Sequence, residues 1–416
     1  MAQGFFHPRR KWARWVLAWG VLTALGSWLH IAFWMGEPAG AGAMGSTMVR
    51  AAANLLYLPS APFSLFALIG LDFWGARGAW QAIVLDAVTW AFWLTMLWVA
   101  MALRRRLRGP RPAGVARTAE VGGISRRRLL LDVVGGAATL GVATPVATAT
   151  LANPWNLRVE RYTVKIRDLP DGLEGLRIVQ ISDTHLGPRI PAEFVRRAVG
   201  LAIDLGADVY ALTGDYVHNG ASQVQLAAEL FVPLVATGKP VVGTLGNHDH
   251  YADPPTGGVM SRALGAIGVR MIDNDRVFLD AATRGLHESA PSQGLCLAGL
   301  ADYGQALIDP GRALGGVPPS MPRVVLSHNP DSVEDPRVTG GPRLDLMLSG
   351  HLHGGQIKLP FVGNLGINSR FRNKYIEGLV QAPTCQIVIS RGVGMSVLPV
   401  RFGVPPELVE ITLTRG

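Results

Sequence analysis

Short apolar runs recur through the C-terminal half of the chain, and each of them ends at a glycine or at a polar side chain. The clearest runs are residues 176–182, 209–213, 241–245, 324–326 and 344–349. Runs of this length are typical of strands that are buried on both faces of a sheet. Segments 193–205 and 223–234, which separate the first three runs, carry apolar residues at helical spacing, and segment 269–300 predicts further strands with turns. The alternation predicts an α/β fold in which helices sandwich a sheet.

A carboxylate, an imidazole or an amide follows each of the five predicted strands. The motifs are Asp183-Thr184-His185, Gly214-Asp215, Gly246-Asn247-His248-Asp249, Ser327-His328 and Gly350-His351-Leu352-His353. In α/β sheets, ligands bind at the carboxyl ends of the strands, where such side chains converge. We therefore expect seven potential metal ligands to lie together: Asp183, His185, Asp215, Asn247, His328, His351 and His353. Mixed carboxylate and imidazole ligands favour Mn, Fe or Zn over Ca or Mg.

The five motifs, present in this order, resemble those of the calcineurin-like metallophosphoesterases, and the resemblance covers about residues 155–416. The sequence from Gly350 to Gln356 and the segment 391–413 look most like the membrane-associated or exported bacterial branch of that family. The resemblance implies a β-sheet sandwich flanked by helices. It also implies a two-metal centre that cleaves phosphoester bonds by attack of a metal-activated water.

The same resemblance implies a role for each ligand. One metal is held by Asp183, His185 and His353. The other is held by Asn247, His328 and His351. Asp215 bridges both ions, and its carboxylate is expected to stay ionised between two positive charges. His248 is not needed as a ligand, which makes it the catalytic candidate for donating a proton to the departing oxygen.

The residues around these motifs carry weaker signals. Asp249 has two interpretations, either as the residue that orients His248 or as a residue that caps the turn. We expect His218 to lie at the surface. Arg391 and Arg401 are interpreted as surface charges rather than as substrate contacts.

The composition is too apolar for a single soluble enzyme, with 49% hydrophobic and 17% charged residues. The formal charge of +9 is concentrated in arginine clusters at 9–14 and 104–128, which flank apolar stretches and indicate membrane topology. We expect no nucleic-acid partner, because no basic patch interleaved with aromatic residues occurs in the catalytic half. Cys296 and Cys385 are predicted to be buried free thiols, with a disulfide as the alternative in an extracytoplasmic domain.

The chain divides into four predicted parts. Residues 1–103 form an α-helical transmembrane region with spans at 15–35 and 80–103, whereas segment 53–71 contains two prolines and either spans, is re-entrant or is interfacial. Residues 104–128 form a basic cytoplasmic linker. Residues 129–152 form either an ordinary span or a twin-arginine-like signal, with a cleavage site near residue 149 as an alternative. Residues 155–416 form the metallophosphoesterase domain.

Because both arginine clusters are expected in the cytoplasm, the catalytic domain is expected outside the cytoplasmic membrane. We therefore expect a membrane-anchored phosphohydrolase with two divalent metal ions and a lipid-borne or envelope-associated phosphoester substrate. One alternative is a pyrophosphatase that acts on a nucleotide-linked lipid A precursor, which requires a cytoplasmic site. A second is a catalytically silent membrane sensor or scaffold, against which the complete set of seven ligands argues.

Overall fold

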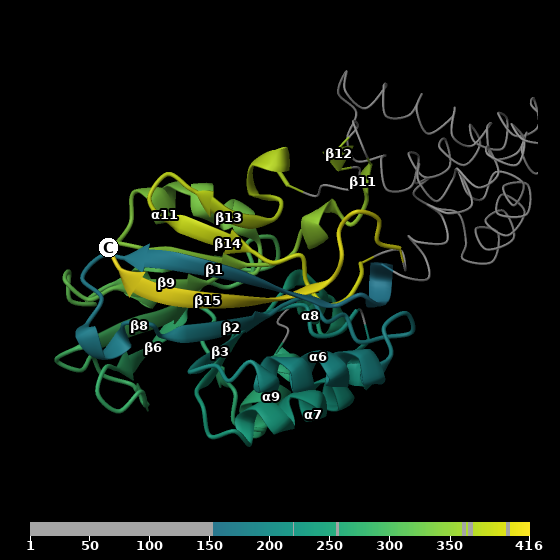
Figure 1. Ribbon diagram of the computed structural model, residues 1–416, viewed down its shortest axis with the longest axis horizontal. Helices are drawn as coiled ribbons and strands as arrows, with labels where there is room; N and C mark the ends of the chain where they lie inside the picture. Colours follow the sequence, from purple (N-terminus) through teal and green to yellow (C-terminus); the bar gives the residue numbers. More distant parts are fainter. Residues whose placement is uncertain (1–152, 219, 255–257, 360–362, 365–368, 397–399) are drawn as a thin grey trace, which may run out of the picture. The chain divides into compact units, whose positions relative to one another are not determined.

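The computed structural model describes residues 153–416, apart from 219, 255–257, 360–362, 365–368 and 397–399 (Figure 1). The predicted membrane region 1–103, the linker 104–128 and the span or signal 129–152 lie outside the described residues. Among the residues that are described, no helix has both the length and the apolarity that crossing a membrane requires.

The first of two large β-sheets is built around parallel strands. Its order is β1-β15-β2-β3-β4-β5, with β2 to β5 mutually parallel and β15 antiparallel to β2 but parallel to β1. The strands are β1 (Arg158–Ile166), β15 (Glu407–Arg415), β2 (Arg177–Ile181), β3 (Val209–Thr213), β4 (Val241–Thr244) and β5 (Arg270–Met271).

The second sheet has the order β13-β14-β10-β9-β8-β6-β7, with a parallel centre from β14 to β8 and antiparallel edges. Its strands are β13 (Gly378–Gln381), β14 (Gln386–Ile389), β10 (Leu346–Ser349), β9 (Arg323–Leu326), β8 (Gly294–Gly299), β6 (Asp275–Asp280) and β7 (Leu286–His287). A separate antiparallel pair joins β11 (Lys358–Leu359) to β12 (Gly363–Asn364).

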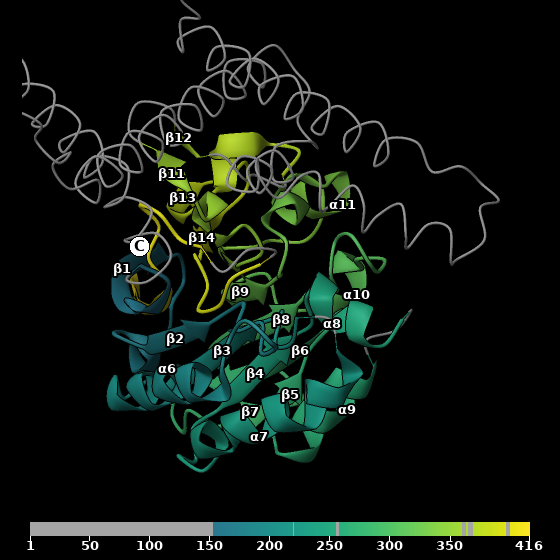
Figure 2. The same ribbon diagram turned by 90° about the vertical axis from the view of Figure 1, so that its right-hand side faces the viewer.

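Helices cover the outer faces of the sheets (Figures 1 and 2). The first sheet packs against α6 (Ala192–Asp204), α7 (Val224–Val235) and α9 (Gly258–Ala266). The second packs against α10 (Pro310–Leu314) and α11 (Pro336–Thr339), while α8 (Asn247–Ala252) follows β4. The short 3-10 helices are η3 (Asn153–Trp155), η4 (Asp171–Leu173), η5 (Ala221–Gln223), η6 (Pro330–Glu334), η7 (His353–Gly355) and η8 (Arg372–Tyr375).

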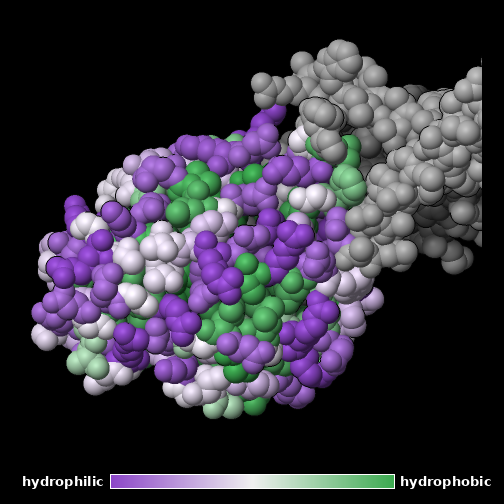
Figure 3. Space-filling view, in the orientation of Figure 1, coloured by the Kyte–Doolittle hydropathy of each residue, from purple (hydrophilic) through white to green (hydrophobic). Residues whose placement is uncertain are grey.

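The apolar core between the sheets explains why the strands are continuous apolar runs. Every residue of β3, β9 and β10 is buried, because each strand faces the opposite sheet on one side and helices on the other. Val209, Val324 and Leu346 are among the side chains that meet between the sheets. Each such burial contributes about 1.5–3 kcal/mol. On the coloured part of Figure 3, hydrophilic residues are spread widely, and a group of hydrophobic residues lies among them.

The predicted α/β sandwich is confirmed in these residues. The five predicted strands are β2, β3, β4, β9 and β10, and the two predicted helices are α6 and α7. Cys296 and Cys385 are both buried and free, so the disulfide alternative is wrong. Burial raises the pKa of each thiol to about 12.

Candidate metal centre

All seven predicted ligands lie where strands of the two sheets end. Asp183 and His185 follow β2, Asp215 follows β3, and Asn247 opens α8 directly after β4. The second sheet supplies His328 after β9 and the pair His351 and His353 after β10. Residues that are far apart in the sequence therefore meet at one edge of the sandwich.

The first group of donor atoms consists of Asp183, His185 and His353, all buried. The Nε2 atoms of the two histidines lie 2.9 Å apart. The Oδ1 atom of Asp183 lies 3.4 Å from Nε2 of His353 and 3.9 Å from Nε2 of His185. One carboxylate and two imidazoles thus face a common point.

The second group consists of Asp215, His328 and His351, to which Asn247 is joined. Oδ2 of Asp215 lies 3.2 Å from Nε2 of His328, and Oδ1 of Asn247 lies 2.9 Å from Nδ1 of His351. The same Oδ2 of Asp215 is 3.4 Å from Nε2 of His185 in the first group. Asp215 therefore lies between the two groups.

One buried nitrogen atom at this edge suits a metal ion. Nε2 of His328 makes no hydrogen bond of good geometry among the described residues, although buried polar atoms normally make one, and it lies 3.2 Å from the carboxylate of Asp215. The other ring nitrogen of His328, Nδ1, is 2.7 Å from the carbonyl oxygen of Thr213, which orients Nε2 toward Asp215. A carbonyl that holds the far nitrogen of a histidine is a common support for a metal ligand. The donor set therefore fits divalent ions.

The electrostatics of three of the histidines and of Asp183 also suit metal binding. Burial lowers the pKa of His185 and of His353 well below the usual range, and it lowers the pKa of His351 to about 3. These imidazoles are neutral at pH 7, which is the state that binds metals. Burial, with the charge of Asp215 adding to it, raises the pKa of Asp183 to about 6.

Asp215 and His328 behave as a charged pair. Burial alone would raise the pKa of Asp215, but His328 and His185 outweigh it and hold that pKa well below the usual range. Burial alone would lower the pKa of His328, but Asp215 raises it well above the usual range. A divalent ion bound at Asp215 and His328 would compete with the proton of His328, because a histidine binds a metal in its neutral form.

Five of the predicted ligands have left-handed backbone conformations, with φ values from 46° to 72°. They are Asp183, His185, Asp215, His351 and His353. Residues with a side chain seldom adopt this region, and such strain concentrates at functional sites. No pattern in the sequence predicts this feature.

Two glycines allow the ligand loops to approach one another. A Cβ atom on Gly246 would lie 2.3 Å from Oδ1 of Asp215. A Cβ atom on Gly350 would lie 2.2 Å from Oδ2 of Asp183. Any side chain at either position would displace a carboxylate of the centre.

Asp249 ties these loops together through main-chain hydrogen bonds. Its Oδ2 accepts from the amides of Gly246 (2.9 Å) and Asp215 (2.8 Å), and its Oδ1 accepts from the amide of Tyr216 (2.9 Å). The capping interpretation of Asp249 is therefore confirmed, because both carboxylate oxygens bind the backbone that carries Asp215.

The predicted proton donor His248 lies beside the ligands. Its amide donates to Oδ1 of Asp215 (2.8 Å), and its ring meets that of His185 edge-on at 4.7 Å between centroids. Its Nδ1 atom contacts the carbonyl oxygen of His218. The surface expectation for His218 is wrong, because this half-buried residue stacks on His248 with centroids 5.0 Å apart.

The surface interpretation of Arg401 is also wrong. Its guanidinium is fully buried, donates to the carbonyl oxygens of Gly392 and Gly394, and lies 3.3 Å from Nδ1 of His353. Arg391 is partly buried and pairs with Glu160. Both arginines are therefore part of the packing behind the ligands rather than surface charges.

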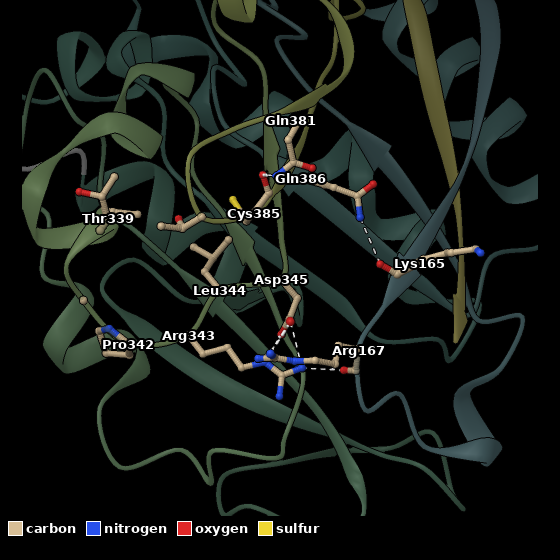
Figure 4. A pocket seen from close by; sticks show the side chains of 13 residues that line it. Lys165, Arg167, Thr339, Pro342, Arg343, Leu344, Asp345, Gln381, Cys385 and Gln386 are labelled. Atoms are coloured by element: carbon tan, nitrogen blue, oxygen red, sulfur yellow. Dashed lines mark hydrogen bonds and ion pairs between the residues drawn. The ribbon is translucent and has the colours of Figure 1, made fainter. Parts of the chain in front are cut away.

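A cavity of about 440 Å³ lies away from these residues, at the opposite ends of β10 and β14 (Figure 4). Among the basic residues that line it, Arg343 is bound to Asp345 (2.9 Å), to Asp168 (2.7 Å) and to the carbonyl oxygen of Arg167 (2.6 Å). None of the seven predicted metal ligands lines this cavity.

Comparison with known proteins identifies the same family. The profile described as calcineurin-like phosphoesterase matches residues 176–355. The uncharacterized metallophosphoesterase YkuE of Bacillus subtilis is 30% identical over 70% of this chain and 98% of its own length. A transmembrane protein with metallophosphoesterase domain from Danio rerio is 29% identical over 62% of this chain and 58% of its own length.

A third relative has a more specific name. UDP-2,3-diacylglucosamine pyrophosphatase LpxG of Chlamydia trachomatis is 27% identical over 64% of this chain and 93% of its own length. The enzyme class expected from the motifs, a metal-dependent phosphoesterase, is confirmed, and the chain belongs to the calcineurin-like phosphoesterase family.

Proposed function

We propose that residues 155–416 form a binuclear metal phosphohydrolase. One ion is held by Asp183, His185 and His353. The other is held by Asn247, His328 and His351. Asp215 bridges them. The observation that carries this proposal is the convergence of donor atoms, which within each group of three lie within 4.8 Å of one another. Mn, Fe or Zn suit this mixture of oxygen and nitrogen ligands.

The residues of the chain have separate tasks in this proposal. Bound here, two divalent ions would acidify a water molecule and neutralise charge on the phosphoryl oxygens. Asp215 keeps its negative charge between the two groups, because its pKa is held low. His248 is beside the centre, with Nδ1 against a carbonyl oxygen. Its task in this proposal is to donate a proton to the departing oxygen.

The first test is an assay of the full-length chain in detergent. After metal removal by a chelator and reloading with Mn, Fe or Zn, we expect hydrolysis of a phosphodiester or phosphomonoester that depends on the added metal. The panel includes a lipid phosphoester and a nucleoside diphosphate sugar. A protein that binds two ions but cleaves none of these would support the sensor or scaffold alternative instead.

We place this enzyme at the cytoplasmic membrane, with residues 155–416 outside and a lipid-borne or envelope-associated substrate. Two features support the placement: the arginine clusters that flank the apolar segments, and a relative that is named a transmembrane protein. Anchoring raises the effective concentration of an enzyme near substrates in the bilayer.

This placement makes a topological prediction. Because nine arginines between 104 and 128 hold the linker in the cytoplasm, a reporter that is active only outside should be active when fused after Gly416. The same reporter fused at Val115 should be silent, which serves as the matched control. The reverse pattern would place the metal residues in the cytoplasm.

A second candidate function is cleavage of a pyrophosphate bond in a nucleotide-linked lipid A precursor. Its support is the relative named UDP-2,3-diacylglucosamine pyrophosphatase, 93% of whose length aligns with this chain. This function requires a cytoplasmic centre, so the fusion experiment separates the two candidates.

A further inference from the structure

Three exposed apolar side chains lie on segments beside the metal residues. Tyr251 is 45% exposed, Leu307 75% and Phe371 37%, and they are three of the six large hydrophobic side chains that are exposed in the described part of the chain. Single exposed apolar residues are ordinary on soluble proteins, but neighbouring ones mark surfaces that bind apolar partners. The contacts between their segments therefore decide whether these three form one surface.

The loop that carries Leu307 contacts α8. The hydroxyl of Tyr251, on α8, accepts a hydrogen bond from Nε2 of Gln305 (3.3 Å). The ring of Tyr251 also meets the ring of His248, with centroids 5.2 Å apart. Leu307 follows Gln305 by two residues. Tyr251 and Leu307 therefore lie on neighbouring segments next to the predicted proton donor.

The same loop also contacts the segment that carries Phe371. The guanidinium of Arg370 lies over the ring of Tyr303, 5.7 Å from the ring centroid, and Phe371 is the next residue. Tyr303 and Leu307 belong to one loop. The four exposed side chains along these contacts are called the rim: Tyr251, Leu307, Arg370 and Phe371.

Hydrogen bonds fix the rim relative to the metal residues. The buried Asp331, in η6, accepts from the amide of Arg370 (2.8 Å). The helix η6 begins two residues after the proposed ligand His328. On the neighbouring loop, the carbonyl oxygen of Leu307 accepts from Nδ2 of Asn274 (2.8 Å). Both loops of the rim are therefore tied to segments of the second sheet that also carry the metal centre.

Positive charge accompanies the apolar side chains of the rim. Arg370 and the nearby Arg372 are exposed, and neither forms an ion pair within the described residues. Carboxylates of η6 are already used, since Asp331 binds the amide of Arg370 and Glu334 pairs with Lys374. Exposed cations beside apolar and aromatic side chains are typical of surfaces that bind anionic lipid headgroups.

We propose that the rim rests on an anionic bilayer, with Leu307 and Phe371 in the apolar part of the interface and Arg370 at the headgroup phosphates. Tyrosine, as at position 251, is a common residue at this depth. This inference rests on the proposed placement of the chain at the membrane, and it specifies which edge of the catalytic domain meets the lipid. Because Tyr251 contacts His248, the proposed metal centre then lies next to phosphoesters at the bilayer surface.

The test places an environment-sensitive dye on the rim of the full-length chain. Leu307→Cys is labelled with a nitrobenzoxadiazole maleimide, and the native Cys296 and Cys385 do not compete because both thiols are buried. In nanodiscs of phosphatidylcholine and phosphatidylglycerol, the emission of the dye should shift to shorter wavelength. Doxyl-labelled acyl chains in the same discs should quench most of this emission.

Leu226→Cys is the matched control. Leu226 is also an exposed leucine, with 42% of its surface accessible, but it lies on α7, which covers the first sheet. Its dye should keep its emission in the same discs. In detergent, both labelled variants should unfold at the temperature of the wild type, which separates lipid contact from a disturbed fold.

Variants that remove charge test the role of the headgroups. Arg370→Gln combined with Arg372→Gln should reduce quenching of the Leu307→Cys dye to the level in discs of phosphatidylcholine alone. High salt should have the same effect, because salt screens exposed charges. Arg196→Gln changes an exposed arginine on α6 and should leave the quenching unchanged.

Equal behaviour of the two dyes, whether both are quenched or neither is, would overturn the inference. Quenching that does not depend on phosphatidylglycerol and survives the double substitution would overturn it as well, because an anionic surface would not be what the rim binds. The proposed two-metal hydrolase would stand in each case, since the dye reports contact with lipid rather than turnover. Failure of the proposed function would instead appear as a wild type without metal-dependent hydrolysis whose dye is still quenched.

Discussion

The Asp215→Asn variant is expected to turn over substrate more than about 100-fold more slowly than the wild type. Mutation of a residue that only supports a metal ligand typically costs about 10- to 100-fold in activity, and replacement of the ligand itself should cost more. Oδ2 of this side chain lies 3.2 Å from His328 and 3.4 Å from His185, so one anion serves both groups of donors. A neutral amide cannot balance two dications. Metal content, measured by mass spectrometry of the purified chain, should fall together with the rate.

The fold should survive this substitution. Asparagine keeps an oxygen at the position of Oδ1, which accepts the amide of His248 at 2.8 Å. Asp204→Asn, at the exposed end of α6, is the matched control and should retain both metals and full rate. If Asp215→Asn kept two metals and a near-normal rate, the bridging role would be wrong.

His248→Ala should keep its metals but hydrolyse substrates with poor leaving groups about 10²- to 10⁴-fold more slowly. The side chain belongs to neither proposed set of ligands, and its ring is held by the carbonyl oxygen of His218. For a p-nitrophenyl leaving group, which needs little protonation, the loss should be much smaller. Steady-state kinetics with an alkyl and a nitrophenyl ester measure the difference.

The alanine variant retains the main-chain amide that donates to Asp215, so the bridging carboxylate should keep its position. His287→Ala, on the exposed strand β7, provides the control and should not affect either substrate. Losses of equal size for both leaving groups would remove His248 from the role of proton donor.

The fold could be predicted far into the catalytic half because its strands are buried on both sides. In β3, β9 and β10 every residue is buried, so these strands appear in the sequence as continuous apolar runs. The amphipathic helix α6 could be predicted from the spacing of its apolar residues, because only one of its faces is buried. The pairing between β1 and β15 could not be predicted, since no local pattern in the sequence indicates which distant strand lies beside β1 in the sheet.

The metal centre contains residues that the sequence predicted and residues that it did not. Asp183, Asp215 and His351 each lie two residues after the end of a strand, so the order of the motifs was enough to predict that they meet. His218 and Arg401 carry no such signal. The first reaches His248 only because two loops pair beyond their strands, and the second reaches His353 only because the C-terminal segment folds back.

The sequence by itself determined the α/β class, the enzyme family and the seven residues that converge, because strand ends and motif order are local properties of the chain. Tertiary structure alone decided the backbone strain of the ligands, the main-chain hydrogen bonds made by Asp249 and the packing of His218 against His248 and His185. These features depend on contacts between loops. The energy of such a contact depends on both segments that meet, so the sequence of neither segment predicts it alone.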